Sequence, residues 1–234
     1  MTSFFDKGNN KMLSDTCFYM PSQAPDVRQA VIMLHGFGSD GNDLISMAPE
    51  MSRDLPETCF YAPDAPYSEG VGYKWFDLDQ IAADTVYEHF DYLQRLMLKA
   101  KAVLPLIFNF IDHIARKHNL SHSQIVLMGF SQGGLLAVMT GLLYAPTIKG
   151  VIGASAVPLS INSALSIDEV KSLPPVLLTH GTDDDVVPYI GAQITQSTLK
   201  NLGCKVQMHT VAGMGHGIDD SSQQAMTDFI KNLS

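Results

Sequence analysis

The sequence predicts an α/β protein with a mostly parallel central sheet and helices on both faces. Short apolar runs rich in β-branched residues alternate with longer segments of helical periodicity, and only short loops separate them. This alternation is typical of parallel sheets, because two parallel strands need a crossover segment between them. Most of the short runs are apolar throughout, as strands covered on both faces are. Since no repeat or linker-like stretch divides the chain, we expect residues 1–234 to form a single domain.

Each element of this sheet can be assigned from its own pattern. The runs predicted to be strands are 31–34, 58–61, 124–128, 150–153, 175–179 and 205–211. The segments with helical periodicity are 86–118, 132–144, 187–202 and 218–233. Pro105 interrupts the first of these segments. A proline inside a helix removes a backbone donor, so we expect Pro105 to kink the helix or to start a second one that ends at His118.

Composition argues against several classes of protein. The chain is 46% hydrophobic, and its 24 acidic and 15 basic residues give a net charge of −9. Such a charge disfavours binding to nucleic acid or to an anionic membrane surface. The beginning of the sequence does not have the layout of a secretion signal, and no apolar run approaches the roughly 20 residues that span a bilayer. We therefore expect a cytoplasmic protein with no nucleic-acid partner and no integral membrane segment.

The cysteines and histidines do not indicate a metal site. Cys17, Cys59 and Cys204 are an odd number and lie far apart, so neither a disulfide framework nor a zinc ribbon is indicated. The eight histidines lack spacings such as His-Glu-x-x-His. We expect reduced thiols, no bound metal and no cofactor.

The first motif that carries chemistry is Gly129-Phe130-Ser131-Gln132-Gly133, which lies between a predicted strand and a predicted helix. A serine hydroxyl becomes a nucleophile when a constrained turn exposes it to a base that can take its proton. The flanking glycines permit a sharp turn because they carry no Cβ atoms. The alternative is a serine that only caps the helix. The context of strand and helix favours Ser131 as the nucleophile of a serine hydrolase.

An acid and a histidine follow in the order that such a hydrolase requires. The strand 175–179 runs into His180-Gly-Thr-Asp-Asp-Asp185, so carboxylates lie at the same edge of a parallel sheet as Ser131. The strand 205–211 runs into a glycine-rich loop that contains His216, which is the better base because His209 lies inside the strand. Spacing alone does not decide which of the three aspartates orients the imidazole.

Stabilisation of a tetrahedral intermediate needs backbone donors directed at its oxyanion. The residue after the nucleophile, Gln132, supplies the first N–H. For the second we nominate the N–H of Phe37, in the loop after strand 31–34, where glycines let the backbone approach a ligand.

The same loop favours a rival function. Residues 36–41 match G-x-G-x-x-G after a strand, which is typical of dinucleotide-binding oxidoreductases. The acid that such a site requires would be Asp64, which follows a proline and is a weak candidate. The rival also leaves Ser131 and His216 unexplained. A hydrolase-fold protein that only binds a ligand is the other alternative.

Taken together, these motifs resemble the phospholipase/carboxylesterase family of α/β-hydrolases, which includes bacterial carboxylesterases and acyl-protein thioesterases. The resemblance covers most of the chain, and it is carried by Leu34-His-Gly-Phe-Gly38, residues 129–133, residues 180–188 and Gly215-His216. In the family pattern the acid is the fourth residue after the histidine of the His-Gly motif. The resemblance thus implies Asp184 as the acid, and it supports Phe37 and Gln132 as oxyanion donors.

The resemblance also extends to the substrate side. Trp75-Phe76-Asp77 is similar to a family segment near the acyl site, which implies substrate contacts for Trp75 and Phe76; core packing is the alternative, because a lone tryptophan is usually buried. Tyr73 stands where the family usually has an arginine. The implied activity is hydrolysis of short- to medium-chain acyl esters through a Ser-His-Asp triad and an acyl-enzyme. An acyl-protein thioesterase or a lysophospholipase is the alternative.

One segment is more apolar than a half-exposed helix should be. Residues 102–111 carry hydrophobic side chains around the whole circumference of the predicted helix. Burial against the sheet explains this most simply. The alternatives are an acyl groove or a subunit interface, which would make the protein a homodimer.

Overall fold

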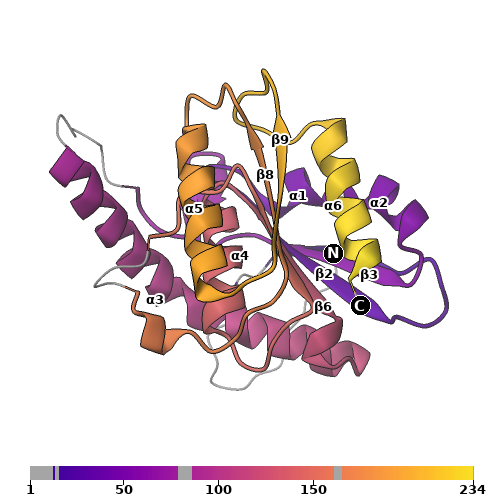
Figure 1. Cartoon of the computed structure of the whole chain (residues 1–234). Coiled ribbons are helices and arrows are strands. Elements are labelled where there is room, and N and C mark those ends of the chain that lie inside the picture. The colour runs from indigo at the N-terminus through magenta and orange to yellow at the C-terminus, as the bar shows by residue number, and fades with distance from the viewer. Residues whose placement is uncertain (1–12, 14–15, 79–85, 161–164, 234) are drawn as a thin grey trace.

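A seven-stranded sheet forms the centre of the computed structural model (Figure 1), which describes residues 13, 16–78, 86–160 and 165–233. The side chains of residues 86–90 are outside this description. The strand order is β1-β3-β2-β6-β7-β8-β9; β1 pairs antiparallel with β3 and all other pairs are parallel. The strands are β1 (Cys17–Met20), β2 (Gln29–Leu34), β3 (Thr58–Pro63), β6 (Ile125–Phe130), β7 (Gly150–Ala154), β8 (Val176–Gly181) and β9 (Val206–Val211).

Helices cover both faces of this sheet, as the sequence predicts. The helices are α1 (Gly41–Ile45), α2 (Ala48–Asp54), α3 (Val86–His118), α4 (Gln132–Leu143), α5 (Tyr189–Leu202) and α6 (Asp220–Asn232). Alternate residues of β2 point to opposite faces: Ile32 packs in the core with α3, α4 and α5, and Val31 packs in the core with α1, α2 and α6. Figure 1 shows these two groups of helices on either side of the strands. Both neighbours of β2 are parallel strands, and all six of its residues are buried.

Five short strands and helices are absent from the prediction. β1, α1 and α2 are short, and the hairpin of β4 (Tyr67–Glu69) and β5 (Gly72–Lys74) has three residues in each strand. None of these segments is long enough to establish a periodicity. Two single turns of 3₁₀ helix, η1 (His122–Gln124) and η2 (Ile167–Glu169), complete the described elements. Helix α6 also begins later than predicted, because Asp219 caps it by accepting a hydrogen bond from the Ser222 N–H at 2.8 Å.

Helix α3 corrects the expectation of a second helix after Pro105. The helix runs from Val86 to His118 with Pro105 inside it. Pro105 is exposed to solvent. Water can therefore bind the backbone carbonyl four residues earlier, which receives no hydrogen bond from the proline. Along the apolar segment 102–111, the Phe108 ring lies 5.1 Å from the Tyr144 ring and the Phe110 ring lies 6.3 Å from the Tyr61 ring, between centroids. Packing inside the protein therefore accounts for the composition of this segment.

All three cysteines are free, and two of them lie in strands of the sheet. Burial raises the pKa of the Cys17 and Cys59 thiols to about 12. These thiols therefore stay protonated at neutral pH and are poor nucleophiles. Within the described ranges, no cluster of three or more His, Cys, Asp or Glu side chains is arranged to hold a metal ion, and no helix has the length and apolar character needed to cross a membrane.

Candidate active site

The sheet brings the predicted site loops to one edge. Strands β2, β6, β8 and β9 are parallel, so their carboxyl ends lie on the same side. Phe37 follows β2, Ser131 follows β6, Asp184 follows β8 and His216 follows β9. The pairing of Leu34 with Gly129 makes the first two of these loops immediate neighbours.

Ser131 occupies a strained turn between β6 and α4. Its backbone has φ 52° and ψ −112°, a conformation that L-residues rarely adopt, and its N–H donates to the Ala154 carbonyl at 2.9 Å. The turn is tight enough to require glycine after Gln132: a Cβ at Gly133 would lie 2.1 Å from the Leu34 carbonyl oxygen. The Ser131 side chain makes no capping hydrogen bond to α4. The alternative in which the Ser131 side chain only caps the helix is therefore wrong.

Asp184 and His216 form a direct pair. The His216 Nδ1 atom lies 2.8 Å from Asp184 Oδ2. The other carboxylate oxygen, Oδ1, accepts from the backbone N–H groups of Val186 at 3.0 Å and Val187 at 2.7 Å. Asp184 is 5% exposed, whereas Asp183 and Asp185 are exposed to solvent. Of the three adjacent aspartates, Asp184 is thus the one that holds the imidazole, and this leaves the Nε2 atom of His216 available for proton transfer.

The loops that carry His216 and Ser131 meet through their neighbours. The Phe130 ring centroid lies 4.8 Å from that of His216, and Ser155 donates from its hydroxyl to the Gly217 carbonyl at 3.2 Å. Ser131 and His216 are both among the described residues, and no hydrogen bond joins their side chains. Catalytic hydrogen bonds are often long in unliganded sites and shorten when substrate binds.

The loop after β2 lies against Ser131. A Cβ added at Gly36 would lie 3.0 Å from the Phe130 ring and 3.4 Å from Ser131 Cβ, so a larger residue would crowd this approach. Phe37, the next residue, is 38% exposed. Gln132 is the first residue of α4, where backbone N–H groups have no partner within the helix. The two nominated donors therefore belong to segments that adjoin Ser131: Phe37 follows Gly36, and Gln132 follows Ser131 itself.

Trp75 and Phe76 are hydrogen-bonded to the segments that carry these donors. The Trp75 indole is completely buried and donates from Nε1 to the His35 carbonyl at 2.8 Å. Its backbone N–H donates to Gln132 Oε1, and Gln132 Nε2 donates to the Phe76 carbonyl, both at 2.9 Å. Trp75 thus ties the loop after β2 to the start of α4. Substrate contact by Trp75 and Phe76 stays a prediction, since Phe76 is only 5% exposed.

His35 supports the same loop from inside. Its Nδ1 lies 2.7 Å from the Gly36 carbonyl and its Nε2 accepts from the Ala65 N–H at 2.9 Å, which requires the neutral Nδ1–H tautomer. Burial lowers the pKa of His35, although Asp64, Asp40 and Asp43 act in the opposite direction. The folded protein therefore keeps this ring neutral at a pH where the unfolded chain protonates it.

We expect this histidine to make the fold less stable in mild acid. Its pKa in the folded state lies below the unfolded value near 6.5, so its stabilising contribution is complete above that pH and is lost as the pH falls toward the folded value. The His35→Gln variant, which keeps an acceptor for Ala65, should show a smaller decrease in unfolding free energy between pH 7 and pH 5. Urea unfolding across this range measures it, and an unchanged slope would contradict the prediction.

The G-x-G-x-x-G pattern has a structural explanation. A Cβ at Gly41 would lie 2.2 Å from the Ala62 carbonyl oxygen, so α1 packs directly on the backbone of β3. Asp64, the acid considered for a ribose, is 2% exposed and accepts from the Gly41 N–H at 2.8 Å. Burial raises its pKa. The glycine pattern is therefore explained by packing of the loop and α1 on β3.

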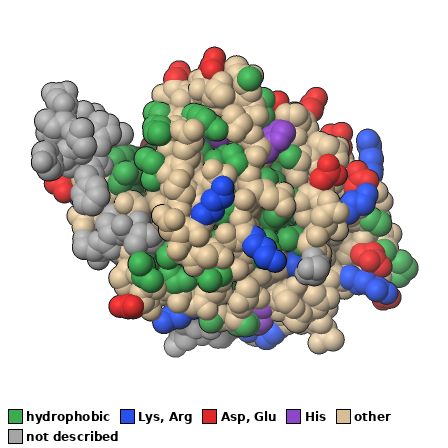
Figure 2. All heavy atoms as spheres, viewed as in Figure 1, with side chains coloured by type: hydrophobic (Ala, Val, Ile, Leu, Met, Phe, Trp, Pro, Cys, Tyr) green, Lys and Arg blue, Asp and Glu red, His purple; other side chains and the backbone are tan. Residues whose placement is uncertain are grey.

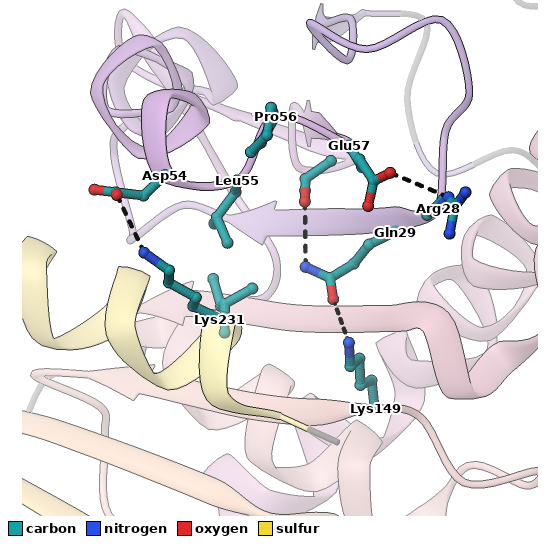
Figure 3. Close-up of a pocket in the computed structure, with 10 residues that line it drawn as sticks. Arg28, Gln29, Asp54, Leu55, Pro56, Glu57, Lys149 and Lys231 are labelled. Carbon is teal, nitrogen blue, oxygen red and sulfur yellow. Dashed lines mark hydrogen bonds and ion pairs between the residues drawn. The ribbon is translucent and has the colours of Figure 1, made fainter.

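A polar hollow of about 330 Å³ lies at the amino ends of the parallel strands, where β2 and β3 begin (Figure 3). Its charged side chains are engaged with one another or with an amide: Arg28 with Glu57 at 3.1 Å, Lys231 with Asp54 at 3.3 Å, and Lys149 with the Gln29 side-chain oxygen at 2.7 Å. None of the predicted site residues lines it. The hollow is therefore separate from the candidate active site, which lies at the carboxyl ends of the strands.

Comparisons with known proteins identify the family of the chain. A profile of the phospholipase/carboxylesterase family matches residues 16–234. The acyl-protein thioesterase 1 of Gibberella zeae is 30% identical over 199 residues, which are 80% of this chain and 82% of that protein. Carboxylesterase SOBER1 of Arabidopsis thaliana is 27% identical over 213 residues, which are 87% of this chain and 90% of that protein.

Among solved structures, the crystal structure of esterase PE8 superimposes with a TM-score of 0.85 at 32% identity, over 96% of this chain and all of that one (100%). These matches confirm the predicted α/β-hydrolase fold and the prediction of a serine hydrolase, and they exclude the dinucleotide-binding oxidoreductase. The chain belongs to the phospholipase/carboxylesterase family.

Proposed function

We propose that this protein hydrolyses carboxylic esters with short- to medium-chain acyl groups through a triad of Ser131, His216 and Asp184. The observation that carries the proposal is the 2.8 Å contact between His216 and the buried Asp184 carboxylate, at the sheet edge where Ser131 sits on its strained turn. A carboxylate held by two backbone N–H groups is a fixed acceptor that orients the imidazole.

The proposed reaction uses these groups in sequence. His216 Nε2 takes the proton of Ser131 as Oγ attacks the acyl carbonyl, and Asp184 stabilises the imidazolium that forms. The backbone N–H groups of Gln132 and Phe37 hold the oxyanion. The imidazolium then protonates the leaving alcohol, which departs and leaves an acyl-enzyme on Ser131. A water molecule, deprotonated by His216, hydrolyses the acyl-enzyme and releases the acid.

Thioesters are the second candidate substrates, because two of the compared relatives carry different names: one is an acyl-protein thioesterase and the other a carboxylesterase. The chemistry is the same with a thiol as leaving group. Apolar side chains beside the site suit either acyl substrate: Val186 is 64% exposed, Ile190 60% and Ile194 49%. They follow the Asp184 loop onto α5 at intervals of four residues. Figure 2 shows hydrophobic side chains around α5.

Labelling with a fluorophosphonate tests the proposal, because such probes react with activated serines. We expect one adduct per chain, located on the peptide that contains Ser131, and no adduct after unfolding. A matched panel of acetyl, butyryl, octanoyl and palmitoyl esters and thioesters should show the highest kcat/KM for esters of intermediate length. An unlabelled native protein without ester hydrolysis would instead favour the hydrolase-fold binding protein, and a consistent preference for thioesters would favour the second candidate.

A further inference from the structure

A second histidine contacts the carboxylate of Asp184. His180 lies on β8, and its side chain is 1% exposed. Its Nε2 atom lies 2.7 Å from the Val187 carbonyl oxygen and 3.2 Å from Asp184 Oδ2. A carbonyl oxygen only accepts, so Nε2 must carry the hydrogen. The structure therefore requires a hydrogen on Nε2, which donates to the Val187 carbonyl, while Asp184 Oδ2 lies beside the same nitrogen.

The contacts of His180 close a ring around the acid. Val187 donates from its N–H to Asp184 Oδ1 at 2.7 Å, and its carbonyl accepts from His180. Both ends of one residue are thus used to hold the Asp184 loop against β8. The second oxygen, Oδ2, lies between His180 Nε2 and His216 Nδ1, which is 2.8 Å away. The same oxygen is therefore bonded to His216 and lies within 3.2 Å of the His180 nitrogen.

We propose that His180 is a positioning residue, which fixes Asp184 Oδ2 in line with His216 and moderates its attraction for the His216 imidazolium. The proposal rests on the proposed function. An N–H donor close to a carboxylate stabilises its negative charge, so the carboxylate has less to offer a second partner.

Few titratable groups surround His180. The small void next to its ring is lined by Gly153, Ala156, Leu178, Ala192 and Thr195, none of which titrates. On the side of α5, the Tyr189 ring lies 6.0 Å from His180, between centroids. The neighbouring Asp183 and Asp185 are exposed, where solvent screens them. Asp184 and His216 are therefore the groups that a change at His180 affects most directly.

Two variants separate this role from simple packing. The His180→Phe variant keeps a ring of similar size and removes the donor, whereas His180→Gln places an amide N–H near the position of Nε2. We expect His180→Phe to lower kcat about tenfold or more with KM nearly unchanged, on the scale of one hydrogen bond to a charged group. The acid limb of its kcat/KM profile against pH should move to higher pH, because Asp184 then attracts the His216 imidazolium more strongly. His180→Gln should restore both kcat and the profile.

The result that would overturn the proposal is an acid limb that does not move in His180→Phe, or a His180→Gln variant as impaired as His180→Phe. If His180→Phe fails to fold, ¹⁵N NMR of histidine-labelled wild-type protein still decides: the proposal requires the Nε2–H tautomer of His180 at neutral pH, and the Nδ1–H tautomer would refute it. Failure of the proposed function looks different, since the wild-type protein would then show neither fluorophosphonate labelling nor ester hydrolysis.

Discussion

Ser131→Ala is expected to lower kcat for ester hydrolysis by about 10⁵- to 10⁶-fold, the scale seen when the nucleophile of a triad is removed. The remaining rate should reflect binding and the oxyanion donors, which the substitution leaves in place. KM should change little, because alanine removes only the hydroxyl from a position whose backbone is held by hydrogen bonds to Ala154 and Val157. Steady-state kinetics with a chromogenic butyryl ester measures the loss.

A matched control for this variant is Ser197→Ala, since Ser197 is an exposed serine on α5. The control should hydrolyse the ester at the wild-type rate. The wild-type protein should also release a burst of alcohol when deacylation is the slower step, and Ser131→Ala should release none. Activity in Ser131→Ala within about 100-fold of wild type would show that another group performs the reaction, because triads lose far more.

Asp184→Asn is expected to lower kcat by about 10⁴-fold, as comparable substitutions of a triad acid do. The amide can no longer accept the His216 Nδ1–H with a negative charge, so the imidazolium loses its stabilisation and the ring loses its fixed tautomer. Burial makes the loss larger, because Asp184 is screened from the water that could replace it. The fall should appear in kcat more than in KM.

The chain supplies two matched controls for this variant on either side of Asp184. Asp183→Asn and Asp185→Asn remove the same charge from exposed positions, and neither should change kcat by more than about twofold, since surface charges contribute little. A comparable loss in all three variants would mean that the net charge of the loop matters and that no single aspartate orients His216. A large loss at Asp183 or Asp185 alone would move the acid to that residue.

Much of this fold and site could be predicted from sequence, because parallel strands impose a common edge. Once 124–128, 175–179 and 205–211 are predicted to be strands, the loops after them must lie together, and Ser131, the aspartates and His216 follow. Spacing could not choose Asp184, because all three aspartates follow the same strand. The choice depends on burial and on the two N–H groups of Val186 and Val187, which are properties of the folded loop.

Other features could not be predicted because their signals are ambiguous or too short. Trp75 reads equally well as core or as substrate contact, and only the folded chain shows its bond to His35. His180 precedes the acid in the sequence, so the order of acid and base that a hydrolase requires indicates His216 instead. Its contact with Asp184 has the i, i+4 spacing of a helix, yet it is made by a strand and a turn. Strand β1 has only four residues and no clear alternation.

The network around Trp75 has a consequence for how activity is acquired during folding. His35, Trp75 and Gln132 are far apart in sequence, and one indole and one amide join them. Such long-range contacts form late, after the entropy of closing large loops has been overcome. A refolding chain can therefore contain most of its helices while the proposed oxyanion donors are still unplaced. The recovery of esterase activity should then lag behind the recovery of far-ultraviolet circular dichroism, and turnover becomes a sensitive reporter of native packing.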